Sequence, residues 1–161
     1  MATDTFLKLK GIDGEAQDKK HSGEIEVLSW SWGVVNSGSA ATGSGAGSGK
    51  ANFQDVSITK LADKASPELM IHCATGKHIP EAVLTCRKAG GEQLEYLKIT
   101  LKDVMVTSFQ TGGSGGGDEI PTENVGLNFA EVKYGYTPQK ADGTGEAEVA
   151  QGYNLKENVK A

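Results

Sequence analysis

Hydrophobic and polar residues alternate with a period of two along most of the chain, which is typical of β-strands that bury one face. The alternating stretches are separated by segments rich in glycine and polar residues. We therefore expect strands at 4–10, 24–35, 50–62, 80–88, 93–108, 122–137 and 152–159.

The alternation slips by one residue inside three of these predicted strands. Leu28 follows Val27 directly, and similar slips come after Leu101 and after Phe129. A one-residue slip moves the apolar residues to the other face of a strand, and a β-bulge that bends the strand is the usual device. Strands that change face partway suit a curved, closing sheet. The pattern therefore predicts a mainly β fold, a small antiparallel β-barrel of two sheets.

One segment departs from the β pattern. Ser66, Pro67 and Glu68 supply an N-cap, a proline at the first helical position and an acid in the first turn, and Gly76 supplies a stop. We expect residues 66–75 to form a short helix that packs on the barrel.

Glycine is concentrated in two segments, 37–50 and 111–119, which contain almost no large side chains. Such segments bury too little apolar surface to offset the entropy lost on ordering, so we expect both to be long flexible loops. The segment 138–151 is polar, and we expect it to be an exposed loop. Residues 1–161 are then a single domain with two glycine-rich loops.

Charge and composition exclude several classes of function. The 161 residues carry 21 acidic and 16 basic side chains, which gives a net charge of -5. Nucleic-acid binding relies on clustered Lys and Arg, so we expect no nucleic-acid partner. No stretch approaches the roughly 18 apolar residues of a membrane span, and the start lacks the features of a secretory signal, so we expect a cytoplasmic product without membrane insertion.

A catalytic serine is weakly suggested by one motif. The residues around Ser114 match the G-x-S-x-G pattern of a nucleophile elbow. That elbow requires a tight turn from a strand into a helix, whereas an extended segment follows here. In so glycine-rich a stretch the match is expected from composition alone.

Phosphate and metal sites are also poorly supported. Lys50 follows a glycine but lacks the spacing and the Ser or Thr of a phosphate-binding loop, so we interpret it as a solvated charge at a strand entrance. The ligand-type residues of the middle of the chain lack the paired spacing of structural zinc sites; they are His72, Cys73, His78 and Cys86. We expect two reduced, buried thiols, with a single bridge left open as an alternative, and neither metal nor cofactor. His21 stands in a polar turn, with no carboxylate or cysteine arrangement that would make it a candidate base.

Trp30 and Trp32 lie two apart on one face of a predicted strand, with Ser29 and Ser31 on the other. We interpret both indoles as core or interface anchors. A sugar-stacking platform is the alternative, and it requires exposed rings.

Several blocks of the chain, in order from Thr5 to about Asn158, resemble one family. They include FLKLKGIDGEAQDKKH, EIEVLSWSWG, the glycine loop that ends in GK, KASPELMIHCATGKHIPEAVLTCRKAGGEQLEYLKITLKDV and TENVGLNFAEVKYGYTPQKADG. Together they resemble the haemolysin-coregulated protein (Hcp) family of bacterial type VI secretion systems.

This resemblance implies a structural subunit and not an enzyme. Members of the family form six-membered rings that stack into the inner tube of a contractile apparatus related to a phage tail. The implied partners are further copies of the chain, a spike protein at the tube tip, the contractile sheath and small effector proteins held and protected inside the ring. The protein is then cytoplasmic before firing and is exported by the machine itself without a signal peptide.

Residues can be assigned to these roles as expectations. A closing ring needs two different complementary surfaces on each copy. We expect the ring interface to include Leu28, Trp30, Trp32, Val34, Leu127, Phe129, Val132 and Tyr134. Ser29 and Ser31 are expected to face the lumen and touch effectors, because they lie on the strand face that points away from the core. For ring stacking, the candidates are Ser39, Thr42, Ser44, Ser48 and Lys50, with 111–119 as a second loop.

Two other classes of function and one structural alternative stay open on the sequence. A monomeric ligand-binding barrel would leave the tryptophan face open, and a serine hydrolase would use Ser114. The two glycine-rich loops have the alternative of being plain surface loops with no role in stacking.

Overall fold

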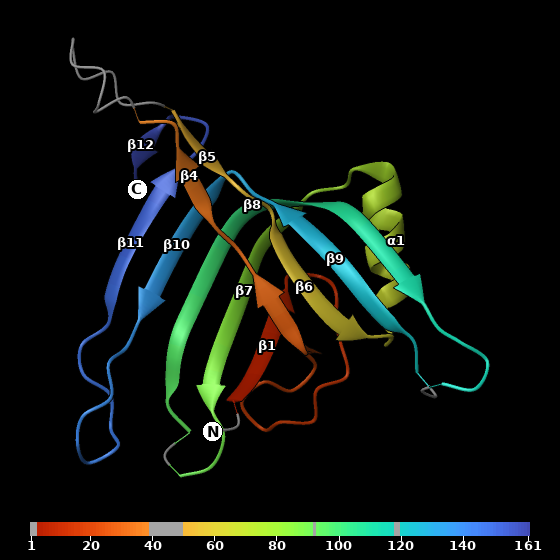
Figure 1. Ribbon diagram of the computed structural model, residues 1–161, viewed down its shortest axis with the longest axis horizontal. Helices are drawn as coiled ribbons and strands as arrows, with labels where there is room; N and C mark the ends of the chain where they lie inside the picture. Colours follow the sequence, from red (N-terminus) through yellow and green to blue (C-terminus); the bar gives the residue numbers. More distant parts are fainter. Residues whose placement is uncertain (1–2, 39–49, 92, 118–119) are drawn as a thin grey trace.

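A computed structural model describes residues 3–38, 50–91, 93–117 and 120–161 of the chain (Figure 1). Within these residues a set of antiparallel strands surrounds one core, and a helix packs at the side. The elements are β1 (Thr3–Leu9), β2 (Ile25–Glu26), β3 (Ser29–Ser31), β4 (Val34–Asn36), β5 (Ala51–Phe53), β6 (Val56–Leu61), α1 (Ser66–Thr75), β7 (Ile79–Lys88), β8 (Glu95–Gly112), β9 (Thr122–Asn128), β10 (Glu131–Tyr136), β11 (Val149–Asn154) and β12 (Val159–Lys160).

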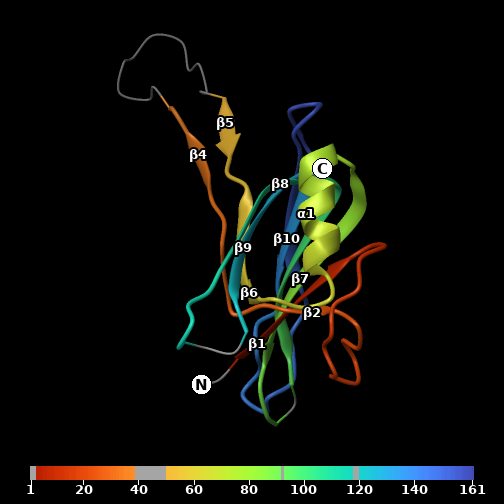
Figure 2. The ribbon, with the colours of Figure 1, turned by 90° about the vertical axis from the view of Figure 1, so that its right-hand side faces the viewer.

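The strands form two layers that share β8, in agreement with the predicted fold. The long sheet has the order β12-β11-β10-β8-β7-β1-β2, and the short sheet has the order β3-β6-β9-β8. In Figure 2 the short sheet lies to the left and the long sheet to the right. The fold is thus a flattened barrel of two sheets, with the long sheet open at its outer strands.

The predicted slips mark the places where the chain passes from one sheet to the other. The backbone N–H of Val27 donates to Thr5 of β1, and the next N–H, of Leu28, donates to Thr59 of β6. In β8 the change falls at Asp103, whose φ of 54° lies in the left-handed region. Each slip is therefore a corner of the barrel.

Two predicted strands are broken where a bulge was expected, so their single-strand assignment is wrong. Segment 24–35 consists of β2, β3 and β4, because the chain changes its pairing partner at the corner. Segment 122–137 consists of β9 and β10, which pair with opposite halves of β8. Segment 50–62 also divides, into β5 and β6.

The predicted last strand, 152–159, is replaced by two strands, of which the first begins earlier than the alternation suggested. β11 starts at Val149, inside the segment 138–151 that was expected to be a loop, and β12 follows as a separate short strand. Of the predicted loop 111–119, Thr111 and Gly112 belong to β8. In strands this short, one or two polar residues are enough to hide the period.

The core lies between the sheets and is built from the inward residues of both. Ile58, Ile99 and Leu127 are completely buried there, with relative exposures of 1%, 0% and 0%. Full burial of such a side chain contributes about 1.5–3 kcal/mol relative to exposure. Helix α1 adds Leu69 to the same core.

The predicted helix 66–75 is confirmed with the same bounds, but its N-cap is Ala65 instead of Ser66. Ala65 occupies the N-cap position, so Ser66 is the first helical residue and its hydroxyl accepts a hydrogen bond from Asp63 N–H. The helix ends at Gly76, which has a φ of 70° and donates its N–H to the His72 carbonyl. Among the described residues, no helix is long and apolar enough to cross a membrane.

Strands β4 and β5 form a hairpin arm that leaves the body of the molecule. They pair with each other and with no further strand of the described chain, and Figure 2 shows them rising above the two layers. Val34 and Val35 remain about half exposed on the arm. A two-stranded ribbon is marginal by itself, so the arm is suited to gain support from another surface.

Candidate surfaces for assembly and cargo

The exposed face of the short sheet is covered by small neutral polar residues. Two rows of cross-strand neighbours run over its four strands, and neighbours in a row share a face. The rows are Ser29–Thr59–Asn124–Gln110 and Ser31–Ser57–Gly126–Ser108. All of these side chains are exposed or half-exposed apart from Gly126, and none carries a charge. We call these eight residues the neutral face.

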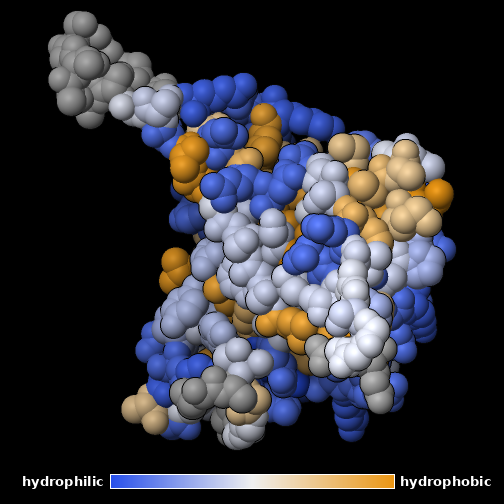
Figure 3. All heavy atoms as spheres, turned by 45° about the vertical axis from the view of Figure 1, so that its right-hand side comes forward, coloured by the Kyte–Doolittle hydropathy of each residue, from blue (hydrophilic) through white to orange (hydrophobic). Residues whose placement is uncertain are grey.

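Contacts inside the neutral face keep its side chains short and flat. Thr59 donates its hydroxyl to Asn124 Oδ1 at 2.8 Å. Gly126 is required for close packing, because a Cβ there would lie 2.6 Å from Ser108 Oγ. At the rim, the carboxylate of Asp55 accepts hydrogen bonds from Thr107 and Asn128. In Figure 3 a broad pale area covers the middle of the molecule, over the strands of this sheet.

The predicted lumen residues lie on this face. Ser29 and Ser31 are both exposed on β3, with Trp30 between them turned toward the core. The rest of the neutral face was missed by sequence reasoning. The other six residues come from β6, β8 and β9, and the sequence does not give the cross-strand register that brings them beside Ser29 and Ser31.

The predicted ring-interface residues divide by burial. Leu28, Val34 and Tyr134 are exposed by 60%, 49% and 39%. Trp30 and Trp32 are half-buried against the core. The remaining three predictions are wrong, because these side chains are buried in the protomer's own core and offer no surface to a neighbour; they are Leu127, Phe129 and Val132.

An aromatic cluster explains why Trp32 is half-buried. Its ring lies 6.1 Å from Phe53, 6.2 Å from Phe129 and 6.1 Å from Tyr134, measured between centroids. Phe53 also lies 5.1 Å from Tyr153. The cluster joins the base of the arm to β10 and β11, so the indole is an anchor and not an open stacking platform.

Among the predicted stacking residues, Lys50 is the one that the structure describes. It is exposed and stands directly before β5, as expected for a solvated charge at a strand entrance. Ser39, Thr42, Ser44 and Ser48 lie outside the described residues.

A buried ionic cluster lies directly beneath the short sheet. Lys60, with 0% exposure, places its Nζ 2.8 Å from Glu123 Oε1, 2.9 Å from Asp63 Oδ1 and 3.0 Å from Ser66 Oγ. Burial alone would raise the pKa of Glu123, but the bonds from Lys60 and Ser66 outweigh it and lower that pKa. The cluster fastens β6, β9 and α1 together.

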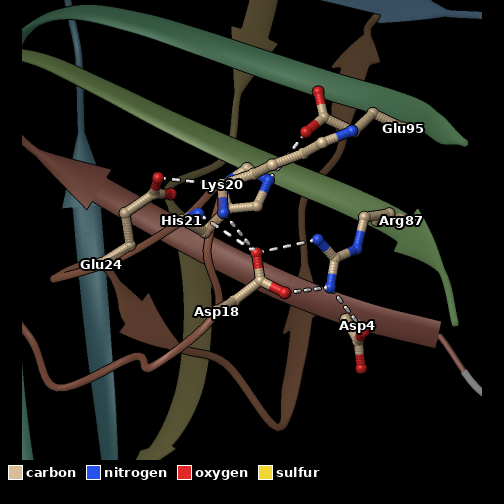
Figure 4. Close-up of polar contacts among 7 residues, drawn as sticks. All are labelled: Asp4, Asp18, Lys20, His21, Glu24, Arg87 and Glu95. Atoms are coloured by element: carbon tan, nitrogen blue, oxygen red, sulfur yellow. Dashed lines mark hydrogen bonds and ion pairs between the residues drawn. The ribbon is translucent and has the colours of Figure 1, made fainter. Parts of the chain in front are cut away.

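A second ionic cluster covers part of the long sheet (Figure 4). Asp18 accepts two bonds from Arg87, at 3.0 Å and 2.7 Å, and Asp4 accepts a third at 3.0 Å. The hydrogen bond from Arg87 holds the pKa of Asp18 far below its usual value. Arg87 also lies over the ring of Phe6. The cluster holds the loop between β1 and β2 against the sheet.

His21 belongs to this second cluster, and a carboxylate lies at each of its ring nitrogens, an arrangement that was not expected from the sequence. Its ring stacks on Phe6 with centroids 4.4 Å apart. Nδ1 lies 2.9 Å from Glu24 Oε2, and Nε2 lies 2.7 Å from Glu95 Oε1. Glu95 is 74 residues away along the chain, so no local signal reveals the contact.

The residues considered for chemistry are dispersed. His72 Nδ1 lies 2.7 Å from the Glu68 carbonyl inside α1, whereas His78 contacts Asp103. Both cysteines are free thiols, Cys86 buried and Cys73 half-buried. Within the described residues no group of three or more His, Cys, Asp or Glu is arranged to hold a metal ion.

Ser114 does not stand in the setting that a nucleophile elbow needs. It lies exposed in a turn after β8, and the next described element is strand β9, not a helix. The strained turn from strand to helix that presents a nucleophile is therefore absent at this described position.

The fold defines a small β-barrel protein whose short sheet has an uncharged outer face and, within the described residues, an open edge at β3. Comparison with known proteins is consistent with this class. The family model described as "Type VI secretion system effector, Hcp" matches residues 6–136. The chain therefore belongs to the Hcp family of type VI secretion proteins.

Individual relatives agree over the full length. "Protein hcp1" of Pseudomonas aeruginosa is 56% identical over 163 residues, with all of both chains covered. The solved structure of Hcp1 from Salmonella typhimurium has 39% identity and a TM-score of 0.81, covering 99% of this chain and 100% of that one. A solved type six secretion system protein has 32% identity and a TM-score of 0.94, with coverages of 99% and 100%.

Proposed function

We propose that the chain is the subunit of the inner tube of a type VI secretion system. Six copies form a ring, rings stack into a tube, and the neutral face of every copy lines the bore. The observation that carries this proposal is the pair of uncharged rows on the short sheet. A surface of hydroxyl, amide and glycine groups is unusual for a solvated protein face and suits a channel through which other proteins pass.

The chemistry of the neutral face fits transient cargo. Each hydroxyl or amide offers one weak hydrogen bond, and no charged group is present in the rows to trap a cargo of either sign. Many weak contacts hold a small protein inside a ring without fixing its orientation. Ser29 and Ser31 are the proposed cargo contacts at the β3 edge, and effectors are held and protected there before export.

Ring closure uses the edges and apolar side chains of the protomer. β3 pairs with β6 on one side, and its other side carries no strand within the described chain. An open edge is a liability unless another chain covers it. Leu28 and Val34 flank this edge, and with Tyr134 they provide exposed apolar area for the neighbour, while Trp30 and Trp32 anchor the strand from below.

Ring stacking is assigned to the arm. β4 and β5 rise beyond both layers and expose Val34 and Val35, and Lys50 stands at the base of the segment 39–49. Contacts along the axis need not be strong singly, because each ring repeats them around its circumference. The second glycine-rich segment, 111–119, is the further candidate.

The role is structural and not catalytic. The tube carries a spike protein at its tip, is surrounded by a contractile sheath, and leaves the cytoplasm when the sheath contracts. The outer face of the long sheet is the surface available to the sheath. The evidence for these partners is the membership of the Hcp family.

The test has two readouts on the same samples. Light scattering and negative-stain microscopy of the purified protein are expected to show ring-sized particles with an open centre. Co-purification of effectors is then compared for wild type and Ser31→Arg, with Lys133→Glu on the outer face of the long sheet as the control. We expect Ser31→Arg to keep its rings and lose the cargo. Intact cargo retention by that variant would contradict the lumen assignment.

A further inference from the structure

Helix α1 carries an apolar stripe on the side that faces away from the core. Pro67, Met70, Ile71 and Ala74 are all exposed, at the spacing i, i+3, i+4, i+7 that places residues on one helix face. Met70 and Ile71 are exposed by 48% and 46%. The opposite side of the helix is also apolar, with Leu69 in the core. A helix that is apolar on both sides is typical of one that is covered on both sides.

The long sheet has a matching uncovered area, which we call the open flank. Tyr134 and Tyr136 lie directly opposite Ile99 and Leu97 of β8, so they share the face that forms the core. Val149 lies opposite Tyr136 on β11. Yet Tyr134, Tyr136 and Val149 are exposed by 39%, 47% and 64%. The core face of this sheet therefore continues past the point where the short sheet covers it.

The two surfaces lie on opposite flanks of the protomer. Figure 1 shows β10 and β11 at the left and α1 at the right, and in Figure 2 the helix is in front. Hydrophobic residues gather at the upper right in Figure 3, over the helix. A ring that closes by rotation requires two different surfaces placed in this way.

The dimensions of the two surfaces agree. A helix of 10 residues is about 15 Å long. A strand of 6 residues such as β10 spans about 20 Å. One face of a helix laid on a sheet is also the usual way in which proteins bury a sheet's apolar side.

A rival occupant of the open flank is another exposed apolar group of the described residues. It consists of Leu28, Leu61 and Ile120, which line a hollow together with Glu15, Glu26 and Asp63. Covering that hollow with an apolar flank would take the exposed carboxylates of Glu15 and Glu26 out of water, which is costly. The helix stripe contains no charged residue among its four members.

We propose that the outer stripe of α1 in one copy covers the open flank of the next copy around the ring. This inference rests on the proposed ring and names the surfaces that close it. Ile71 and Met70 of the helix pack against Tyr136, Tyr134 and Val149 of the neighbour. Every copy then uses its helix on one side and its flank on the other.

Cross-linking tests the pairing without destroying the interface. In a Cys73→Ser background, Ile71→Cys and Tyr136→Cys are made singly and together, and assembled rings are treated with a short bis-maleimide. Cys86 stays in place, because it is 2% exposed and buried in the core. We expect neither single variant to cross-link, a mixture of the two to give covalent dimers, and the double variant to give a ladder that ends at the closed ring.

The control uses the other face of the same strand. Lys133 is exposed on β10 and points away from the open flank. Ile71→Cys combined with Lys133→Cys is therefore expected to give no ladder. Rings that form in the double variant with Tyr136→Cys but yield no cross-linked ladder would overturn the pairing and leave the ring proposal standing. Failure of the Cys73→Ser background to form rings, with wild type also monomeric, would overturn the proposed function and with it this inference.

A second pair of variants measures the contribution of the interface to assembly. Ile71→Glu and Tyr136→Glu are each expected to shift the protein from rings to protomers in light scattering, with unfolding curves that stay close to wild type because both sites are exposed. Rings of unchanged stability in both variants would overturn the pairing.

Discussion

The outer faces of the two sheets have the same backbone architecture and opposite chemistry. On the short sheet, the rows contain serine, threonine, asparagine, glutamine and glycine. On the long sheet, the equivalent positions carry long charged side chains, including the row Glu81–Lys102–Glu131 and the exposed Lys98 and Lys133. A solvated face has no need to avoid charge, so this difference supports the proposal that the neutral face contacts other chains.

The short sheet does carry charged side chains, but they lie on its inner side, toward the core. Lys60 and Glu123 lie directly under the neutral face, completely enclosed. On the long sheet the ionic groups lie outside, where Arg87 is covered by the loop that carries Asp18 and His21. The short sheet thus has its ion pair on the core side and the long sheet has its ion pair on the outer side, and variants can measure how much each contributes to stability.

The largest expected effect comes from removing the buried cation. Lys60→Met leaves Glu123 buried and unpaired, which should cost about 3–5 kcal/mol of unfolding free energy. The matched surface change, Lys133→Met, should stay within about 0.5 kcal/mol. Urea unfolding of both variants measures the difference. Similar stabilities for the two would contradict the inner placement of the charge.

Acidity should weaken the long-sheet cluster next. The hydrogen bond from Arg87 lowers the pKa of Asp18 from its ordinary value of 3.8. Asp18 is therefore protonated at a lower pH in the folded state than in the unfolded chain. The stabilisation is complete above that ordinary pKa and is lost as the pH falls toward the folded value. Asp18→Asn should therefore be less stable than wild type at pH 7, and the gap should narrow in acid. Asp13→Asn, an exposed aspartate of the same loop, serves as the control; a gap that widens in acid would refute the assignment.

A smaller effect is expected from replacing one glycine in the outer face of each sheet with alanine. A Cβ at Gly126 would lie 2.6 Å from Ser108 Oγ and 3.0 Å from Thr107 Oγ1, in a packed row. Gly126→Ala should cost about 1 kcal/mol. At Gly135 the near atom is Glu148 Oε2, at the end of an exposed side chain that can move away, so Gly135→Ala should cost less. Thermal unfolding ranks the two, and the reverse order would show that the neutral face is loosely packed.

The smallest expected effect is the response of cargo to salt. Because the neutral rows contain no charge, retention of effectors by the ring should change little between about 0.05 M and about 0.5 M salt, where ionic contacts are strongly screened. Co-purification at the two salt concentrations measures it. A steep loss at high salt would assign the cargo contact to charged residues elsewhere.

Much of the architecture could be predicted from the alternation of residues. The strands, the helix and all three corners follow from where the apolar phase continues or slips, because burial on one face is a local pattern. The alternation does not reveal why the phase slips. The structure shows that the chain changes its partner strand at Val27 and at Asp103. Two strands were therefore predicted as continuous where the chain crosses between sheets.

The candidate surfaces were predicted less completely. Ser29 and Ser31 could be placed opposite the core phase, but Asn124 and Gln110 join them through a register that depends on strands far apart in the chain. Burial of Leu127 could not be separated from interface contact, since both require an apolar residue. The outer stripe of α1 was not predicted from the sequence, and the exposure of Met70 and Ile71 became evident in the structure.

The central claim is that the neutral face lines the bore of a ring, and labelling of that face tests it most directly. In a Cys73→Ser background, Ser31→Cys and Lys133→Cys rings are labelled with maleimide-coupled gold and imaged end-on by negative-stain microscopy. The account predicts gold in the central hole for Ser31→Cys and on the outer rim for Lys133→Cys. Gold on the rim of the Ser31→Cys rings would contradict it.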